Sequence, residues 1–178
     1  MSLYKALNQP MCRSSSQIHR NTQFQFPNPP PPPPPPPTAK MPFTLLLFVH
    51  RKPDVSPEFF KIEYEKHIEH VKRLAWDTFP LTHKRTYIAR TTVDTPPEGA
   101  SERNALTPAT VFAGKQSDYD YDVMAEVTFV DKAGFEAFWK KTSLPEAEAE
   151  LRAHEKEFMD AKKFGVVVVG DLLMTEGN

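Results

Sequence analysis

The chain has 178 residues, with 22 Lys and Arg against 23 Asp and Glu, and a single cysteine. Residues 1–41 carry no acidic residue and eleven of the nineteen prolines, which leaves a net charge of −5 on residues 42–178. That balance, without a basic stripe interleaved with aromatic residues, argues against nucleic-acid binding. The apolar runs are too short to cross a bilayer. With Cys12 as the only cysteine, residues 42–178 offer no disulfide and no thiolate metal site. We expect a soluble, cytoplasmic protein.

The N-terminal segment 1–41 has the composition of a disordered tail. Its nine consecutive prolines, Pro29–Pro37, predict a polyproline II rod. Such a rod serves either as a spacer or as the ligand of an SH3- or WW-type partner. Residues 42–178 are enough for one domain.

The elements expected in residues 42–178 follow the order strand, helix, strand, strand, helix, strand. Strands are predicted at 43–50, 83–92, 119–130 and 164–174, and the first helix at 56–76. The second helical part is divided: Asp131 caps a short helix, and the capping-box spacing Ser143…Glu146 starts the last one. This order predicts an α+β fold, a ferredoxin-like βαββαβ domain whose antiparallel sheet carries its helices on one face.

The first and last strands, FTLLLFVH and FGVVVVGDLLM, are apolar on both faces. Such strands need cover on both faces. The helices of the chain cover one face, and the sheet of a partner subunit is an economical cover for the other. We therefore predict a homodimer.

Two regions leave alternatives open. The loop 93–118 is long enough to be either a functional lid or a disordered segment, with a short extra strand at 109–113. In strand 119–130 the alternation places Asp122 on the face opposite the apolar residues. A carboxylate there is an ordinary solvated group, unless that face lies inside a barrel, where it becomes a candidate acid/base group.

The helix 56–76 begins at a serine N-cap followed by Pro57, which suits the first helical position. At about 100° per residue, His67 falls in the same stripe as Phe60 and Tyr64, so its imidazole is expected to point inward. An imidazole beside a phenol is a candidate proton-transfer pair. The alternative is a core histidine that is hydrogen-bonded to a backbone carbonyl.

Metal binding is not expected. Glu63, His67 and His70 stand at i, i+4 and i+7, but His67 points inward whereas His70 lies at the rim of the stripe. His154, in the apolar stripe of the last helix, is expected to be a core histidine. The sequence has no glycine-rich phosphate loop, G-x-S-x-G or H-E-x-x-H. What remains is cofactor-free acid/base chemistry, or no chemistry.

Four segments resemble the family of EthD-type dimeric α/β barrels, especially its fungal polyketide-cluster branch. They are F-x-x-x-Y-x-x-H (Phe60, Tyr64, His67), FPLTHKRTYIAR (Phe79–Arg90), YDYDVMAEVTF (Tyr119–Phe129) and FMDAKKFGVVVVGD. The resemblance covers roughly residues 42–176 and leaves the N-terminal segment out. Near the last helix, where the broad family often has an Asp-Glu pair, this chain has His154-Glu155.

The resemblance implies a ferredoxin-like subunit that pairs sheet to sheet with a second copy. It also implies an aromatic or polyketide-like substrate in a pocket between sheet and helices, without a cofactor. We expect a decarboxylase or a dehydratase/cyclase. The alternatives are an EthD-type oxidoreductase or cofactor-free oxygenase on phenolic substrates, and a non-catalytic dimer that binds a hydrophobic ligand; a fold does not choose among them.

By the same match, His67 is the general acid/base, and Tyr64 orients it or holds a substrate oxygen. His83 is expected to be a second proton carrier, and Asp122 the group that fixes the tautomer of His83. The side chains expected to bind the substrate are Phe48, His50, Trp76, Tyr87 and Met124.

Overall fold

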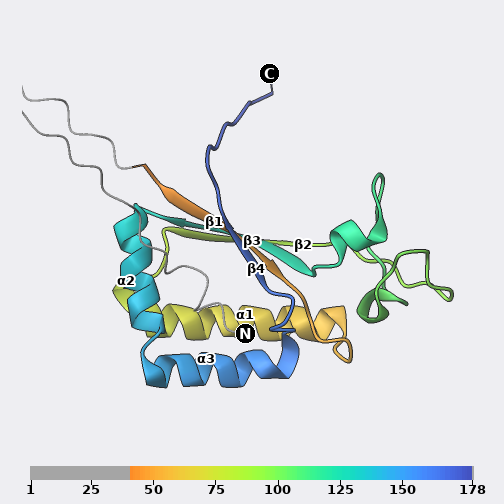
Figure 1. Ribbon diagram of the computed structural model, residues 1–178, viewed down its shortest axis with the longest axis horizontal. Coiled ribbons are helices and arrows are strands. Elements are labelled where there is room, and N and C mark those ends of the chain that lie inside the picture. The colour runs from red at the N-terminus through yellow and green to blue at the C-terminus, as the bar shows by residue number, and fades with distance from the viewer. Residues whose placement is uncertain (1–40, 178) are drawn as a thin grey trace, which may run out of the picture. The chain divides into compact units, whose positions relative to one another are not determined.

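The computed structural model describes residues 41–177, which form a four-stranded sheet and three α-helices (Figure 1). The strands are β1 (Phe43–Val49), β2 (Thr82–Tyr87), β3 (Val123–Phe129) and β4 (Gly165–Val168). The helices are α1 (Pro57–Ala75), α2 (Lys132–Thr142) and α3 (Pro145–Phe158), with 3-10 turns at Trp76–Thr78, Glu102–Asn104 and Gln116–Tyr119. The predicted disordered tail, its proline rod and Cys12 lie outside the described residues.

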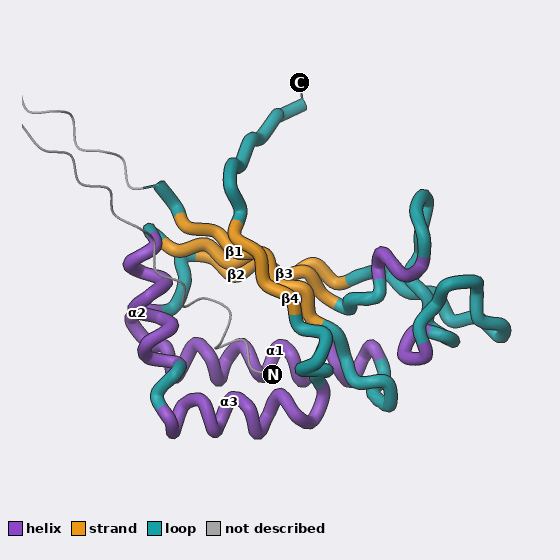
Figure 2. Tube along the Cα trace, viewed as in Figure 1, coloured by secondary structure: helices purple, strands orange, loops and turns teal. Residues whose placement is uncertain are grey.

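The sheet has the order β2-β3-β1-β4, and every neighbouring pair is antiparallel. All three helices lie on the same side of it (Figures 1 and 2). Together with the βαββαβ succession, in which the second helical part is divided into α2 and α3, this order is that of a ferredoxin-like α+β fold. The predicted fold class is confirmed.

Helix α1 begins as its sequence predicts. The Ser56 hydroxyl accepts a hydrogen bond from the Phe59 N–H at 3.2 Å, and Pro57 occupies the first turn. The helix ends at Ala75, because Trp76 adopts a positive φ of 51°, where a side chain is disfavoured. Neither α1, with its 19 residues, nor any other helix within residues 41–177 has the length and apolar character that a bilayer crossing requires.

The core lies between the sheet and the helices. Every second residue of β3 is buried on the helix side of the sheet, and β1 contributes Leu45 and Val49 on the same side. Phe60, Tyr64 and His67 of α1 are buried as well. The face of α1 that carries His67 is therefore its core face, as the helical periodicity predicts.

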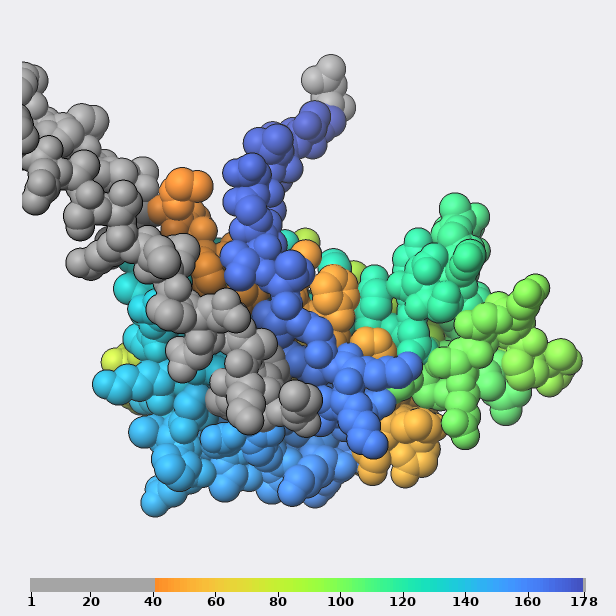
Figure 3. All heavy atoms as spheres, in the orientation of Figure 1, coloured from red at the N-terminus to blue at the C-terminus, as the bar shows by residue number. Residues whose placement is uncertain are grey.

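Two strands end earlier than expected. β2 ends at Tyr87, because its last partner on β3 is Val123, where that strand begins. β4 ends at Val168, because its partner β1 starts at Phe43. After β4, the Val169 N–H still donates a hydrogen bond to the Thr44 carbonyl of β1. The residues after Val169 extend away from the sheet on the side opposite the helices (Figures 1 and 3). The extra strand expected at 109–113 is reduced to a single bridge at its first residue.

The predicted capping box does not form. Ser143 already ends α2, where its N–H donates to the Trp139 carbonyl at 2.9 Å. The N-cap of α3 is Leu144, which offers no side-chain hydrogen bond, and Pro145 is the first residue of the helix. Because α2 and α3 are so close in sequence, Ser143 cannot serve both helix ends.

Candidate active site

The His67 imidazole lies on the core side of α1 and faces α3, with 6% of the residue exposed. Its ring centroid is 5.9 Å from that of Phe158 and 6.5 Å from that of Tyr64. Burial lowers the pKa of His67 to about 3, since desolvation penalises the charged ring, and neighbouring histidines act in the same direction. His67 is therefore neutral near pH 7, with one ring nitrogen free to accept a proton.

His154 of α3 connects His67 to the carboxylate of Glu63. Its Nδ1 lies 3.4 Å from His67 Nδ1, and its Nε2 lies 3.1 Å from Glu63 Oε2. The other oxygen of Glu63 accepts a hydrogen bond from Lys66 Nζ at 2.7 Å, which is the main reason why the pKa of Glu63 is lowered. His67, His154 and Glu63 thus form a chain of two imidazoles and an ionised carboxylate, which we call the His–His–Glu chain.

A second carboxyl group faces the other nitrogen of His67. Glu155 Oε1 lies 3.5 Å from His67 Nε2. Burial raises the pKa of Glu155, in contrast to that of Glu63. Because a raised pKa brings a carboxyl group closer to proton exchange near neutral pH, Glu155 is also a candidate acid/base group.

From the sheet, β2 turns His83 toward the helices, because His83 pairs with a buried residue of β3, Val127. Its Nε2 is buried and has no hydrogen-bond partner among the residues that the structure describes. Desolvation by burial lowers the pKa of His83 to about 4, so this ring is also neutral near pH 7. A buried nitrogen without a partner costs free energy, which a polar group of a ligand would recover.

Glu65 holds two side chains of β2 in place. Its Oε1 accepts hydrogen bonds from Tyr87 Oη at 2.6 Å and from Arg85 Nε at 2.9 Å. Burial and the neighbouring carboxylate raise the pKa of Tyr87. Tyr87 therefore stays a phenol that donates to Glu65.

Tyr64, the predicted partner of His67, is 3% exposed. Its ring is nearly parallel to that of Phe60, with centroids 5.7 Å apart. Burial raises the pKa of Tyr64, so its hydroxyl remains protonated and can act only as a neutral hydrogen-bonding group near pH 7.

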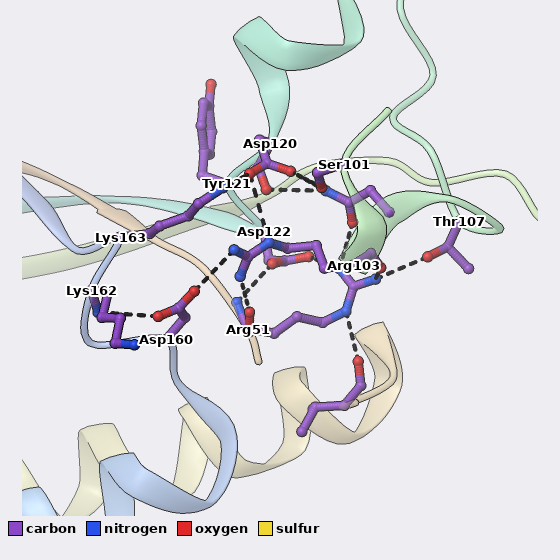
Figure 4. A network of polar contacts seen from close by, with 12 residues as sticks. Arg51, Ser101, Arg103, Thr107, Asp120, Tyr121, Asp122, Asp160, Lys162 and Lys163 are labelled. Atoms are coloured by element: carbon purple, nitrogen blue, oxygen red, sulfur yellow. Dashed lines mark hydrogen bonds and ion pairs between the residues drawn. The ribbon is translucent and has the colours of Figure 1, made fainter. Parts of the chain in front are cut away.

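Asp122 belongs to a different polar network (Figure 4). Its Oδ2 accepts the Arg51 N–H at 2.8 Å, and its Oδ1 pairs with the Arg51 guanidinium and with Arg90 Nη2, the latter at 2.9 Å. His83 pairs with Val127, five residues further along β3, which is roughly 16 Å away at 3.3 Å per residue. The prediction that Asp122 fixes the tautomer of His83 is therefore wrong.

The same network anchors the long connection between β2 and β3. Arg51 donates to Asn104 Oδ1 at 2.7 Å and to Thr107 Oγ1 at 2.9 Å. Arg103 pairs with Asp160 Oδ2 at 3.0 Å (Figure 4). The loop predicted to be a lid or disordered is thus tied by buried side chains to the start of the β1–α1 connection; its role as a lid stays a prediction.

Phe48, His50 and Met124 are not on the His67 side of the sheet. Phe48 and Met124 pair in register on β1 and β3, on the face that points away from the helices. The His50 ring, just beyond β1, lies 6.4 Å from that of Tyr121. Within one subunit, these three side chains and His67 do not line one pocket.

Trp76 is 77% exposed. It lies nine residues beyond His67, roughly 13 Å along the axis of α1. It borders a shallow surface depression of about 450 Å³ instead. The other residues that line this depression are Glu69, Lys72, Arg73 and Asp77. The prediction that Trp76 lines the pocket of His67 is wrong.

The structure brings four of the predicted site residues to the helix side of the sheet: Tyr64, His67, His83 and Tyr87. Sequence reasoning missed Glu65 and Glu155, and it expected His154 to be a core histidine, whereas its ring lies between His67 and Glu63. The available signal was the presence of carboxylates beside histidines in two helical stripes. Within residues 41–177, no group of three or more His, Cys, Asp or Glu side chains is arranged to hold a metal ion.

Fold and site together define a ferredoxin-like α+β domain with neutral histidines buried between its sheet and helices. The family model of the EthD domain matches residues 52–162. The chain belongs to the EthD domain family. No curated protein matches the sequence.

Three solved structures are similar to this chain. A dimeric ferredoxin-like protein of unknown function from Thermobifida fusca is 13% identical, with a TM-score of 0.40, over 73% of this chain and 91% of that one. An EthD family protein from Bacillus halodurans is 14% identical, with a TM-score of 0.41, over 73% and 99%. A hypothetical protein from Arabidopsis thaliana is 17% identical, with a TM-score of 0.41, over 78% and 95%.

Proposed function

We propose that the protein is a cofactor-independent acid/base enzyme, of the decarboxylase or dehydratase/cyclase type, that acts on an aromatic or polyketide-like molecule. One observation supports the proposal: two neutral imidazoles, His67 of α1 and His83 of β2, lie on the helix side of the sheet, and within residues 41–177 the buried Nε2 of His83 has no hydrogen-bond partner. Structural histidines usually satisfy both ring nitrogens. A buried nitrogen without a partner, on the same side of the sheet as a second imidazole, suits a site that is completed by a ligand.

In this proposal His67 exchanges a proton with the substrate, and His83 hydrogen-bonds a substrate oxygen or carries a second proton. Tyr64, kept as a phenol by burial, donates a hydrogen bond to a substrate oxygen. Because the pKa of His67 is about 3, its charged form persists only where a negative charge compensates it. An anionic substrate, Glu155 beside His67 Nε2, and the ionised Glu63, reached through His154, are sources of such charge.

The surroundings of His67 favour a flat, apolar substrate. Phe60, Tyr64 and Phe158 are nearly fully buried and pack against one another in the same core cluster. A substrate that reaches His67 therefore meets apolar, aromatic surroundings, which favour an aromatic ring. A hydroxylated aromatic or polyketide-like molecule presents such a ring together with oxygens for the imidazoles.

The test is a turnover assay with two kinds of probe: resorcylic acids and their alkylated relatives, which can lose carbon dioxide or be oxygenated, and aryl-substituted β-hydroxy ketones, which can lose water. Carbon dioxide release, loss of water and oxygen consumption are followed in parallel, so that decarboxylation, dehydration and oxygenation are separated. In His67→Gln we expect the rate to fall by roughly 10²–10⁴, the usual contribution of general acid/base catalysis. Oxygen consumption in place of the first two products would favour the cofactor-free oxygenase instead.

The second candidate is a dimer that binds a hydrophobic ligand without transforming it. The hydrogen bond between His67 and His154 of α3 supports this candidate, because a histidine with a purely structural role is also held by such a bond. In that case His67→Gln changes the affinity for the same probes in an equilibrium binding measurement, and no probe is consumed by either protein.

We also propose that the protein is a homodimer, joined through the sheet face that points away from the helices. Leu46, Phe48 and Met124 lie on that face by their register, and in the described chain no helix covers it. An apolar sheet face in water calls for cover. In this arrangement Phe48 and Met124 are subunit contacts.

A further inference from the structure

The two imidazoles of the His–His–Glu chain meet through identical atoms. His67 Nδ1 and His154 Nδ1 face each other at 3.4 Å. A hydrogen bond between them needs one N–H donor and one lone pair, so the two rings must hold different tautomers. A group that fixes the tautomer of one ring therefore also fixes the tautomer of the other.

The carboxylate of Glu63 fixes the tautomer of His154. Its pKa is lowered, so near pH 7 it is ionised and only accepts hydrogen bonds. His154 must then carry a hydrogen on Nε2, which faces Glu63 Oε2 at 3.1 Å. A neutral His154 consequently has its lone pair on Nδ1, and His67 must donate its Nδ1–H. This leaves the His67 Nε2 lone pair free to accept a proton.

We propose that His154 and Glu63 are positioning residues, which set His67 in its Nδ1–H tautomer, and that His154 accepts the Nδ1 proton of His67 during the reaction. A proton that a substrate donates to His67 Nε2 forms a new N–H bond there. The His67 Nδ1–H bond breaks, and that proton moves to His154 Nδ1. The positive charge then rests on His154, beside the carboxylate of Glu63. The inference rests on the proposed role of His67 as the acid/base group.

The surroundings of the His–His–Glu chain bear on this direction of proton transfer. The exposed fraction of the side chain rises from 7% for His67 to 14% for His154, so the charge moves from the drier to the wetter ring. Two further groups face the two rings: the His70 ring lies 4.9 Å from that of His154, and Glu155 Oε1 lies 3.5 Å from His67 Nε2. Glu155 competes with His154, because its carboxylate favours a hydrogen on His67 Nε2. The Nδ1–Nδ1 distance exceeds the usual hydrogen-bond length by about 0.5 Å, so transfer requires the rings to approach.

The test reads the tautomers of nitrogen-15 labelled histidines by long-range proton–nitrogen correlation near pH 7, without any substrate. In the wild-type protein we expect His67 mainly as the Nδ1–H form and His154 as the Nε2–H form. His154→Phe keeps a ring but removes the acceptor, so His67 should change to mainly Nε2–H, facing Glu155. In His154→Asn, the amide oxygen takes the place of Nδ1 as acceptor, and His67 should stay Nδ1–H.

His70→Phe is the matched control, because it removes a ring that touches His154 without a hydrogen bond to His67. The tautomer of His67 should not change in it, and near-ultraviolet circular dichroism reports whether each variant is folded. A wild-type His67 that is mainly Nε2–H, or one that keeps its tautomer in folded His154→Phe, overturns the inference. These outcomes are independent of turnover, so failure of the proposed function would be seen separately, in His67→Gln.

Discussion

At the scale of single residues, burial keeps the imidazoles of His67 and His83 neutral near pH 7. The direction in which His67 points follows from helical periodicity alone, and so it could be predicted from sequence. Its contacts with His154 and Glu155 could not. They depend on how α1 and α3 pack against each other, which neither helical pattern specifies by itself. The lack of a partner for His83 Nε2 among the described residues likewise depends on the paths of several elements, which the sequence does not specify locally.

The lowered pKa of His67 predicts how stability varies with pH. The folded state takes up a proton on His67 only near pH 3, whereas an unperturbed histidine does so near 6.5. Between these values the unfolded chain binds more protons, so the free energy of unfolding falls as the pH falls, by up to about 1.4 kcal/mol per pH unit. His67→Phe removes this contribution. Between pH 7 and 5 the variant should lose about 2 kcal/mol less than the wild type in urea unfolding.

His83 stays in both proteins, so its own contribution to the pH dependence cancels in the comparison. Equal losses of unfolding free energy in the wild type and in His67→Phe would mean that His67 is protonated as easily in the folded protein as in the unfolded chain. The description of His67 as a neutral buried imidazole would then be wrong.

At the scale of elements, the sequence predicts the type and order of the elements, because alternation and helical stripes are local signals. It misses the ends where the limit comes from a partner strand: β2 stops where β3 begins, and β4 stops near the residue where β1 begins. Asp122 shows the same limit. Its place on a strand is readable, but the two arginines that bind it, Arg51 and Arg90, come from connections whose paths are not local.

Asp122 is predicted to stabilise the fold rather than to act in catalysis. Asp122→Asn leaves Arg51 and Arg90 with a neutral partner in a buried place, and removing one member of a buried pair typically costs about 3–5 kcal/mol. Urea unfolding should show such a loss. The exposed pair of Asp77 with Lys141 is the control, and Asp77→Asn should leave the stability nearly unchanged. A stability of Asp122→Asn equal to that of the wild type would refute the structural role.

At the scale of the whole molecule, β1 is apolar on both faces, but one subunit buries only one of them. The helices cover one face of the sheet, and Leu46, Phe48 and Met124 lie on the other. Strand composition predicts the need for cover, since a strand apolar on both faces is buried on both. It does not predict which residues pair across the interface.

The proposed dimer predicts that one charge on this face separates the subunits. Leu46→Glu places a carboxylate beside Glu126 of β3, its partner in register, and burying this charge against a second sheet would be costly. Sedimentation should then show a monomer, and a dimer for the wild type. Ile62→Glu, on the exposed side of α1, is the matched control and should remain dimeric. A monomeric wild type, or a dimeric Leu46→Glu, contradicts the proposed interface.

Whether His67 is the acid/base group is decided by the turnover of a resorcylic acid probe by His67→Gln, compared with the wild type and with His70→Gln at equal unfolding midpoints. We expect a rate lower by roughly 10²–10⁴ in His67→Gln and an almost unchanged rate in His70→Gln. A folded His67→Gln protein that turns the probe over at the wild-type rate would contradict this role of His67.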